Sequence, residues 1–79
     1  MKVEVDLLAG QQLKASFGDH EIISDQSHAV GGAEAYPEHF QYFLASMPLC
    51  AAFYIRKFCQ QREISTDGIR IIQNHQDLS

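Results

Sequence analysis

The chain has no tryptophan, only two cysteines and two prolines, and few basic residues. Six Lys and Arg residues stand against ten Asp and Glu residues, which gives a net charge of −4. This acidic balance lacks the basic surface that binds nucleic acid, so we expect no nucleic-acid partner. Two cysteines are too few for a disulfide-stapled secreted protein. Glu4 and Asp6 interrupt any apolar signal segment, so a cytoplasmic location is expected.

The composition is that of a packed protein, because 46% of the 79 residues are hydrophobic and 20% are charged. This excludes disorder and low-complexity sequence. A domain this short buries only about 60% of the surface that its unfolded chain exposes. We therefore expect either a partner chain or further sequence to complete its core.

Three short segments near the amino terminus have the alternation of β-strands. Residues 2–8 and 12–17 alternate apolar with polar side chains, and a third short segment lies around 21–24. Gly10 and the Gly18-Asp19 pair between them are turn signals. The sequence therefore predicts an antiparallel meander with one apolar face.

A long apolar segment follows a glycine-containing loop. Apolar side chains recur every three or four residues from Phe40 to Phe58, which predicts a helix over about 37–62. Residues 42–55 include no charged side chain, so we predict that the helix is buried on nearly all sides. The uncharged run is shorter than the roughly 20 residues that span a bilayer, and no membrane partner is expected.

The sequence after the helix predicts another turn and a further strand. Ile69 and Ile71 alternate with Arg70, which indicates a strand over 68–73. The predicted fold class is therefore α+β: an antiparallel β-meander, a long buried central helix and a further strand. Three short strands cover only one side of such a helix, so either a second copy of the chain or sequence outside it must cover the other.

Cys50 is the main candidate for chemistry. Pro48 removes one backbone hydrogen bond inside the helix and frees the carbonyl of Leu44, so a kink is expected just before Cys50. A cysteine attacks only as a thiolate, which needs a nearby cation, a helix amino terminus or a hydrogen-bonding partner. The alternative is a structural role, because free cysteines are often buried. Cys59 lies about 13 Å further along the helix, cannot pair with Cys50, and is predicted to be core.

No metal site or other cofactor is expected. The four histidines lack the spacing of metal ligands, and no phosphate-binding loop or Ser-His-Asp arrangement is present. The histidines are His20, His28, His39 and His75.

The order of these segments resembles the OsmC/Ohr family (osmotically inducible protein C and organic hydroperoxide resistance protein). In that family a loop with glycines and proline leads into a Leu-Ala-x-x-x-x-Cys helix and then a strand. The matching parts here are Gly31-Gly32, Pro37-Glu38, the segment FQYFLASMPLCAA at 40–52, FCQQR at 58–62 and Asp67-Gly68-Ile69. The resemblance covers about residues 28–72. It implies an OsmC-like α+β fold in which two chains interlock as a homodimer, with residues 1–79 forming one domain that is incomplete and corresponds to its N-terminal portion.

The resemblance also implies a redox function. The cysteine matching Cys50 attacks an organic hydroperoxide and becomes a sulfenic acid, which a second, later cysteine resolves and a dithiol reductant restores. The family's glutamate aligns with Gln41, and Glu38 is the nearby carboxylate, so Cys50, Glu38 and Gln41 are the candidate catalytic residues. No arginine precedes Arg56, although the family uses one from the amino-terminal region.

Two functions follow from the resemblance and stay open at this point. The first is a thiol-dependent peroxidase that reduces organic hydroperoxides in oxidative stress defence. The second is a non-catalytic OsmC-like dimeric module that binds a small apolar ligand or a protein partner. The uncharged Gln41 favours the second function.

Overall fold

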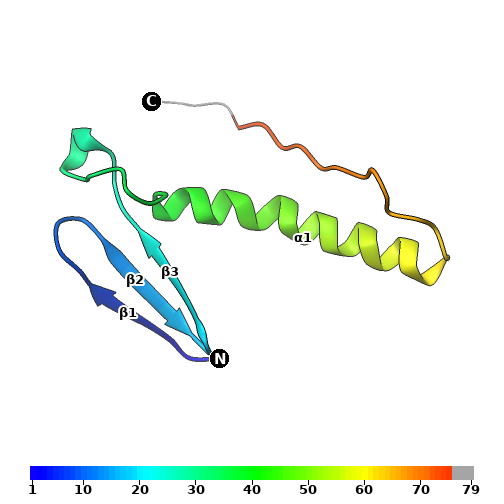
Figure 1. Ribbon diagram of the computed structural model, residues 1–79, viewed down its shortest axis with the longest axis horizontal. Helices are drawn as coiled ribbons and strands as arrows, with labels where there is room; N and C mark the ends of the chain where they lie inside the picture. Colours follow the sequence, from blue (N-terminus) through cyan, green and yellow to red (C-terminus); the bar gives the residue numbers. More distant parts are fainter. Residues whose placement is uncertain (76–79) are drawn as a thin grey trace. The chain divides into compact units, whose positions relative to one another are not determined.

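The computed structural model describes residues 1–75, and it is an α+β structure in which a three-stranded antiparallel sheet is followed by one long helix (Figure 1). The predicted α+β class is thus confirmed. The chain divides into two compact units, Met1–Tyr42 and Phe43–Ser79. The elements are β1 (Val3–Leu7), β2 (Leu13–Phe17), β3 (His20–Ser24), a 3₁₀ turn (His28–Val30) and α1 (His39–Gln61).

The sheet has the strand order β1-β2-β3, which confirms the predicted meander. Val5 lies opposite Ala15, and Ala15 lies opposite Ile22, so the apolar residues of β1 and β2 share one face with Ile22, whereas Ile23 lies opposite Lys14 on the other face. The β2–β3 connection is a two-residue turn in which Gly18 has a φ of 58°. This position is the one at which a type II′ hairpin turn favours glycine.

The helix α1 begins two residues later than the proline that was expected to open it. The side-chain oxygen of Gln41 accepts a hydrogen bond of 3.0 Å from the backbone N–H of Glu38, and the carbonyl of Glu38 accepts the N–H of Gln41 at 3.0 Å. This exchange is one half of a capping box, and it makes Glu38 the residue that caps the helix. The helix then runs through Pro48 as one element.

The carboxyl end of α1 closes with a Schellman motif. The N–H of Ile64 donates to the carbonyl of Cys59 at 2.8 Å, and the N–H of Glu63 donates to the carbonyl of Gln60 at 3.4 Å. Glu63 has the positive φ of 54° that this motif requires. These bonds pair helix carbonyls that would otherwise lack a partner, and they set the end of the helix close to the predicted residue 62.

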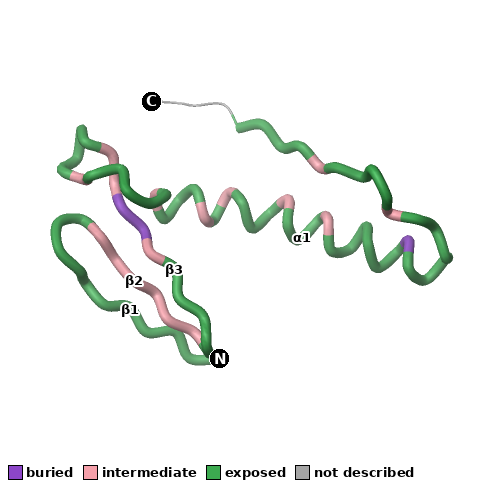
Figure 2. Tube along the Cα trace, viewed as in Figure 1, coloured by how far each residue is buried: buried purple, intermediate pink, exposed green. Residues whose placement is uncertain are grey.

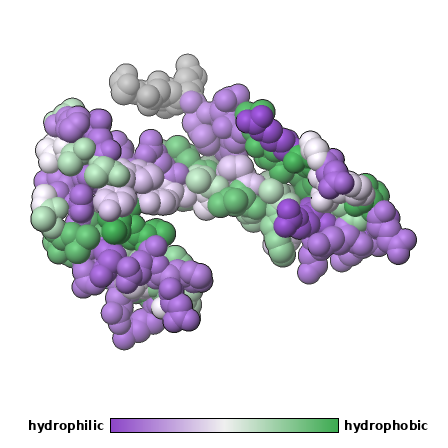
Figure 3. All heavy atoms as spheres, in the orientation of Figure 1, coloured by the Kyte–Doolittle hydropathy of each residue, from purple (hydrophilic) through white to green (hydrophobic). Residues whose placement is uncertain are grey.

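The predicted burial of the helix is not found in the single chain. Of the residues of α1, all of which the structure describes, only Cys59 is buried (Figure 2). Leu49 is 70% exposed and Tyr54 is 65% exposed. Apolar residues along α1 consequently lie at the surface of the chain (Figure 3). A wide apolar helix face needs a second layer against it.

The predicted strand over 68–73 is wrong for the chain as it stands. Gly68 takes a φ of 80° in a turn that the N–H of Ile69 closes onto the carbonyl of Thr66 at 3.1 Å. The described residues after this turn, 69–75, include no strand. An alternating pattern forms a strand only when a neighbouring strand pairs with it, and within residues 1–75 the strands β1, β2 and β3 pair only with one another. Within residues 1–75, no helix combines the length and the apolar character that a membrane crossing requires.

Candidate functional site

The thiol of Cys50 lies exposed on α1, in the second unit. Within the described part of the chain, no hydrogen bond to the Cys50 sulfur occurs. Cys59 is the buried cysteine, with 6% of its surface exposed, as predicted for a core residue.

Glu38 and Gln41, the two residues expected to assist Cys50, contact each other at the start of α1. The contact is the hydrogen bond between the Glu38 N–H and Gln41 Oε1. Both residues belong to the first unit, whereas Cys50 belongs to the second, so their joint action with Cys50 stays a prediction. Both also line a cavity of about 440 Å³ whose other walls come from the loop before the helix: Gln26, Ser27, Glu34, Ala35, Tyr36 and Pro37.

Asp25 organises that loop, a role that the sequence did not reveal. Its side chain is 1% exposed and accepts three backbone hydrogen bonds: Oδ1 from Gln26 at 2.8 Å and Ala33 at 3.5 Å, and Oδ2 from Ala35 at 3.2 Å. The backbone N–H of Asp25 donates to the carbonyl of Pro37 at 3.0 Å. One carboxylate thus ties the end of β3 to residues eight and ten positions further along the chain.

The hydrogen bonds lower the pKa of the Asp25 carboxyl below its ordinary value of 3.8. The backbone N–H of Gln26 contributes most, burial acts in the opposite direction, and the N–H groups of Ala35 and Ala33 and the side chain of Gln12 add to the lowering. Donors aimed at the ionised form stabilise that form. Asp25 is therefore a charged carboxylate held by amides rather than a proton donor.

Acid is expected to weaken the first unit through Asp25. Because the pKa of the folded carboxyl is lowered, its contribution to stability is complete above the unfolded pKa, near pH 4, and is lost as the pH falls through the folded pKa. We expect Asp25→Asn to lower the thermal midpoint near pH 6 by roughly 5–15 °C, and this difference to shrink below about pH 4. Thermal unfolding of both proteins, followed by circular dichroism across this pH range, measures the effect. A constant difference at all pH values would contradict it.

The rest of the loop is closed by Gly32 and by the pair His28 and Glu34. The N–H of Gly32 donates to the carbonyl of Ser27 at 2.9 Å, and Glu34, with a φ of 53°, donates its N–H to the carbonyl of Gln26 at 3.1 Å. One ring nitrogen of His28 lies 3.0 Å from the carbonyl of Gly32, and the other lies 3.5 Å from a carboxylate oxygen of Glu34. These contacts define the conformation of the loop that carries the 440 Å³ cavity.

A second cavity in the first unit is apolar. It has a volume of about 180 Å³ and lies between the apolar face of the sheet and the first turn of α1. The hydroxyl of Tyr42 donates to the carbonyl of Ile23 at 2.8 Å, which fixes that turn against β3. The polar groups at this cavity are Ser24, the His39 ring and Tyr42. Its aliphatic lining is Val5, Leu13, Ala15 and Ile22.

Among residues 1–75, no group of three His, Cys, Asp or Glu side chains is arranged to hold a metal ion. Among the described residues, the features that can support a function are therefore the exposed Cys50 on α1, the polar cavity of the loop and the apolar cavity on the sheet. No family model, curated protein or solved structure matches the chain.

Proposed function

We propose that the chain is an OsmC-like module that works as a homodimer and reduces organic hydroperoxides through Cys50. The observation that carries the proposal is the accessible Cys50 thiol on a long helix that follows a three-stranded meander. This is the order of elements that the resemblance implies. A buried thiol would have favoured a purely structural cysteine.

The exposed apolar side chains of α1 support the homodimer. Phe53, Tyr54 and Phe58 expose 57%, 65% and 51% of their surfaces, although aromatic side chains of this size normally contribute to a core or an interface. A second copy of α1 offers a matching apolar face. A two-fold arrangement would remove both faces from water in one step.

The proposed reaction balances with a dithiol as the co-reactant. The Cys50 thiolate attacks the terminal oxygen of the hydroperoxide, a sulfur–oxygen bond forms, the oxygen–oxygen bond breaks, and the alkoxide leaves as the alcohol after taking a proton. One thiol of the reductant then displaces water from the sulfenic acid, and its second thiol releases Cys50 and closes the reductant's disulfide. The sulfur is oxidised once and reduced once in each cycle.

The test is the rate at which Cys50 becomes a sulfenic acid. We expect stoichiometric cumene hydroperoxide to oxidise Cys50 of the reduced full chain roughly 100-fold faster than free cysteine, because in the proposed homodimer Glu38 or Gln41 would supply the hydrogen-bonding partner that the sulfur lacks within the single chain. Dimedone trapping followed by peptide mass spectrometry measures the rate. The buried Cys59 is the internal control and should stay unmodified. Oxidation of Cys50 at the rate of free cysteine would disprove the peroxidase.

The apolar cavity on the sheet favours the second function, binding of a small apolar ligand. Its volume of about 180 Å³ is close to that of engineered apolar cavities of about 150 Å³ that bind benzene. The His39 ring supplies a polar group at its edge, where Nδ1 already contacts the side-chain amide of Gln26 at 3.3 Å. Retention of binding without Cys50 would separate this function from the peroxidase.

A further inference from the structure

The apolar cavity on the sheet has one buried polar side chain in its wall. Ser24, the last residue of β3, lies opposite Leu13 of β2, so it belongs to the apolar face of the sheet. Both residues line the cavity, which has a volume of about 180 Å³. Ser24 is 8% exposed, although serine is mostly found at protein surfaces. A hydroxyl group is thus placed among aliphatic side chains at the wall of a cavity.

The Ser24 hydroxyl makes no hydrogen bond with another described residue. No fully enclosed side-chain oxygen or nitrogen in that part of the chain is unpaired, so the Ser24 oxygen keeps some accessible surface. Burying a hydroxyl without a partner is unfavourable, and a ligand that supplies the partner removes this cost. The Ser24 hydroxyl is therefore a group in the cavity wall that can recognise a polar atom of a ligand.

The His39 ring, which also lines the cavity, offers a hydrogen-bond donor. Its Nδ1 lies 3.3 Å from the side-chain amide nitrogen of Gln26. An amide nitrogen only donates, so Nδ1 is the acceptor and the proton of the neutral ring lies on Nε2. The third polar group of the lining, the Tyr42 hydroxyl, already donates to the carbonyl of Ile23 at 2.8 Å. The polar groups that a ligand can pair with are consequently the Ser24 hydroxyl and the Nε2–H of His39.

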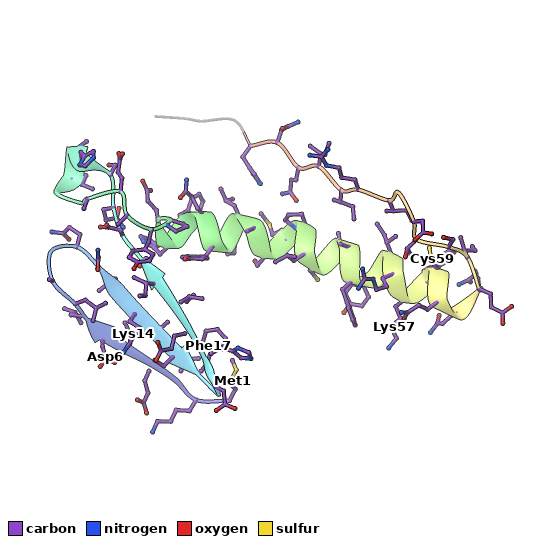
Figure 4. All side chains as sticks on the ribbon, in the orientation of Figure 1. Met1, Asp6, Lys14, Phe17, Lys57 and Cys59 are labelled. Atoms are coloured by element: carbon purple, nitrogen blue, oxygen red, sulfur yellow. The ribbon has the colours of Figure 1, made fainter. Side chains whose placement is uncertain are left out.

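The charged side chains of the sheet lie on its other face. Figure 4 shows Asp6 of β1 beside Lys14 of β2, the residue opposite it in the register. Lys14 also lies 4.0 Å from a carboxylate oxygen of Glu21. The lining of the cavity includes no Asp, Glu, Lys or Arg residue. An ionic ligand would lose its hydration there without gaining an opposite charge, so the cavity favours a neutral ligand.

We infer that this cavity binds a small neutral alcohol whose apolar part is about the size of one aromatic ring. The inference rests on the ligand-binding function proposed above and names the chemical class of its ligand. The alcohol hydroxyl complements the two polar groups, because it can accept from the Nε2–H of His39 and donate to the Ser24 oxygen. The size follows from the volume of about 180 Å³, since cavities of about 150 Å³ bind benzene.

Two probes of matched shape test the inference with the full chain. Benzyl alcohol and ethylbenzene differ only in that a hydroxyl replaces a methyl group. We expect Ser24→Ala to raise the dissociation constant of benzyl alcohol about tenfold and to leave that of ethylbenzene unchanged within about twofold, because only the alcohol loses a hydrogen bond. Amide chemical shifts recorded by nuclear magnetic resonance during titration measure both constants. Ser16→Ala, the same change opposite Glu21 on the polar face, should alter neither.

A third variant tests the location of the ligand. Ala15→Val adds two methyl groups to the cavity wall on a strand, where a β-branched residue is favoured, and should weaken the binding of both probes at least about fivefold. Unchanged binding of both probes by Ala15→Val would place them elsewhere and overturn the inference.

The remaining outcomes separate the inference from the proposed functions. If Ser24→Ala leaves the binding of benzyl alcohol unchanged, or weakens both probes equally, recognition of the alcohol by Ser24 is wrong and the ligand-binding function stands. If the wild type binds neither probe, the inference and that function are both wrong. The peroxidase is judged separately, by the oxidation of Cys50.

Discussion

Replacing Gly32 with alanine is expected to open the loop before α1 and to lower the stability of the first unit by about 3 kcal/mol. A Cβ at this position would overlap the backbone carbonyl of Gln26 and lie 2.7 Å from the Cα of Gln26. Backbone atoms cannot move aside as the end of a side chain does. The Gly32–Ser27 and Glu34–Gln26 backbone hydrogen bonds, of 2.9 Å and 3.1 Å, would have to break to relieve the overlap.

This loss corresponds to a fall in the thermal midpoint of roughly 10–20 °C. Gly31→Ala is the matched control. Gly31 has a φ of 89°, but the nearest atom to its Cβ would be the side-chain Nε2 of Gln11 at 3.7 Å, so only the backbone conformation is unfavourable. We expect that control to cost about 1 kcal/mol. Equal midpoints for the two variants, measured by circular dichroism, would mean that close packing of Gly32 against Gln26 does not hold the loop.

Hydrophobic periodicity was sufficient to predict β1, β2, β3 and α1, because each of these elements forms from residues that are close together in the sequence. Val3 and Val5 alternate with acidic residues, and the turn at Gly18 sets the register of the next hairpin. The start of α1 moved from Pro37 to His39 because Gln41 caps the helix through Glu38. A side-chain cap of this kind involves a specific pair of residues and leaves only a weak signal in hydrophobic periodicity.

The segment 68–73 shows where periodicity alone is insufficient. Alternation of apolar and polar residues predicts which side chains share a face. A strand also needs backbone hydrogen-bond partners on a neighbouring strand. In the single chain, the described residues of this segment have no such partner. The predicted burial of α1 relied on a second copy or further sequence, and in the single chain only Cys59 of the helix is buried. Hydrophobicity indicates that a surface is covered in the assembled protein but does not identify what covers it.

The roles of the candidate site residues stay predictions. Cys50 was singled out by its place in the helix and by the family resemblance, and the structure places its thiol at the surface. Asp25 was missed because its partners are backbone amides, those of Gln26 and of two residues eight and ten positions further along, which no side-chain motif encodes. The available signal was an aspartate directly after a strand, followed by a glycine pair at which the chain can turn back.

Replacing Cys50 with serine is expected to remove the reduction of organic hydroperoxides by the full chain. The serine hydroxyl is almost fully protonated near neutral pH and forms no sulfenic acid, so the catalysed rate should fall at least about 100-fold. Cys50 is exposed and the substitution changes only one side-chain atom, so the thermal midpoint should change by no more than roughly 3 °C. Consumption of cumene hydroperoxide in the presence of a dithiol measures the activity.

Cys59→Ala is the matched control for the loss of one thiol. Cys59 is 6% exposed, so its replacement should lower stability slightly and leave hydroperoxide reduction intact at a temperature where the protein is folded. Loss of activity only in Cys50→Ser would assign the reaction to the accessible sulfur. Equal activity in both variants and the wild type would contradict the proposed reduction of hydroperoxides through Cys50. If Cys50→Ser then still bound a small aromatic ligand in the cavity that Ile22 and Tyr42 line, the binding function would be the one that remains.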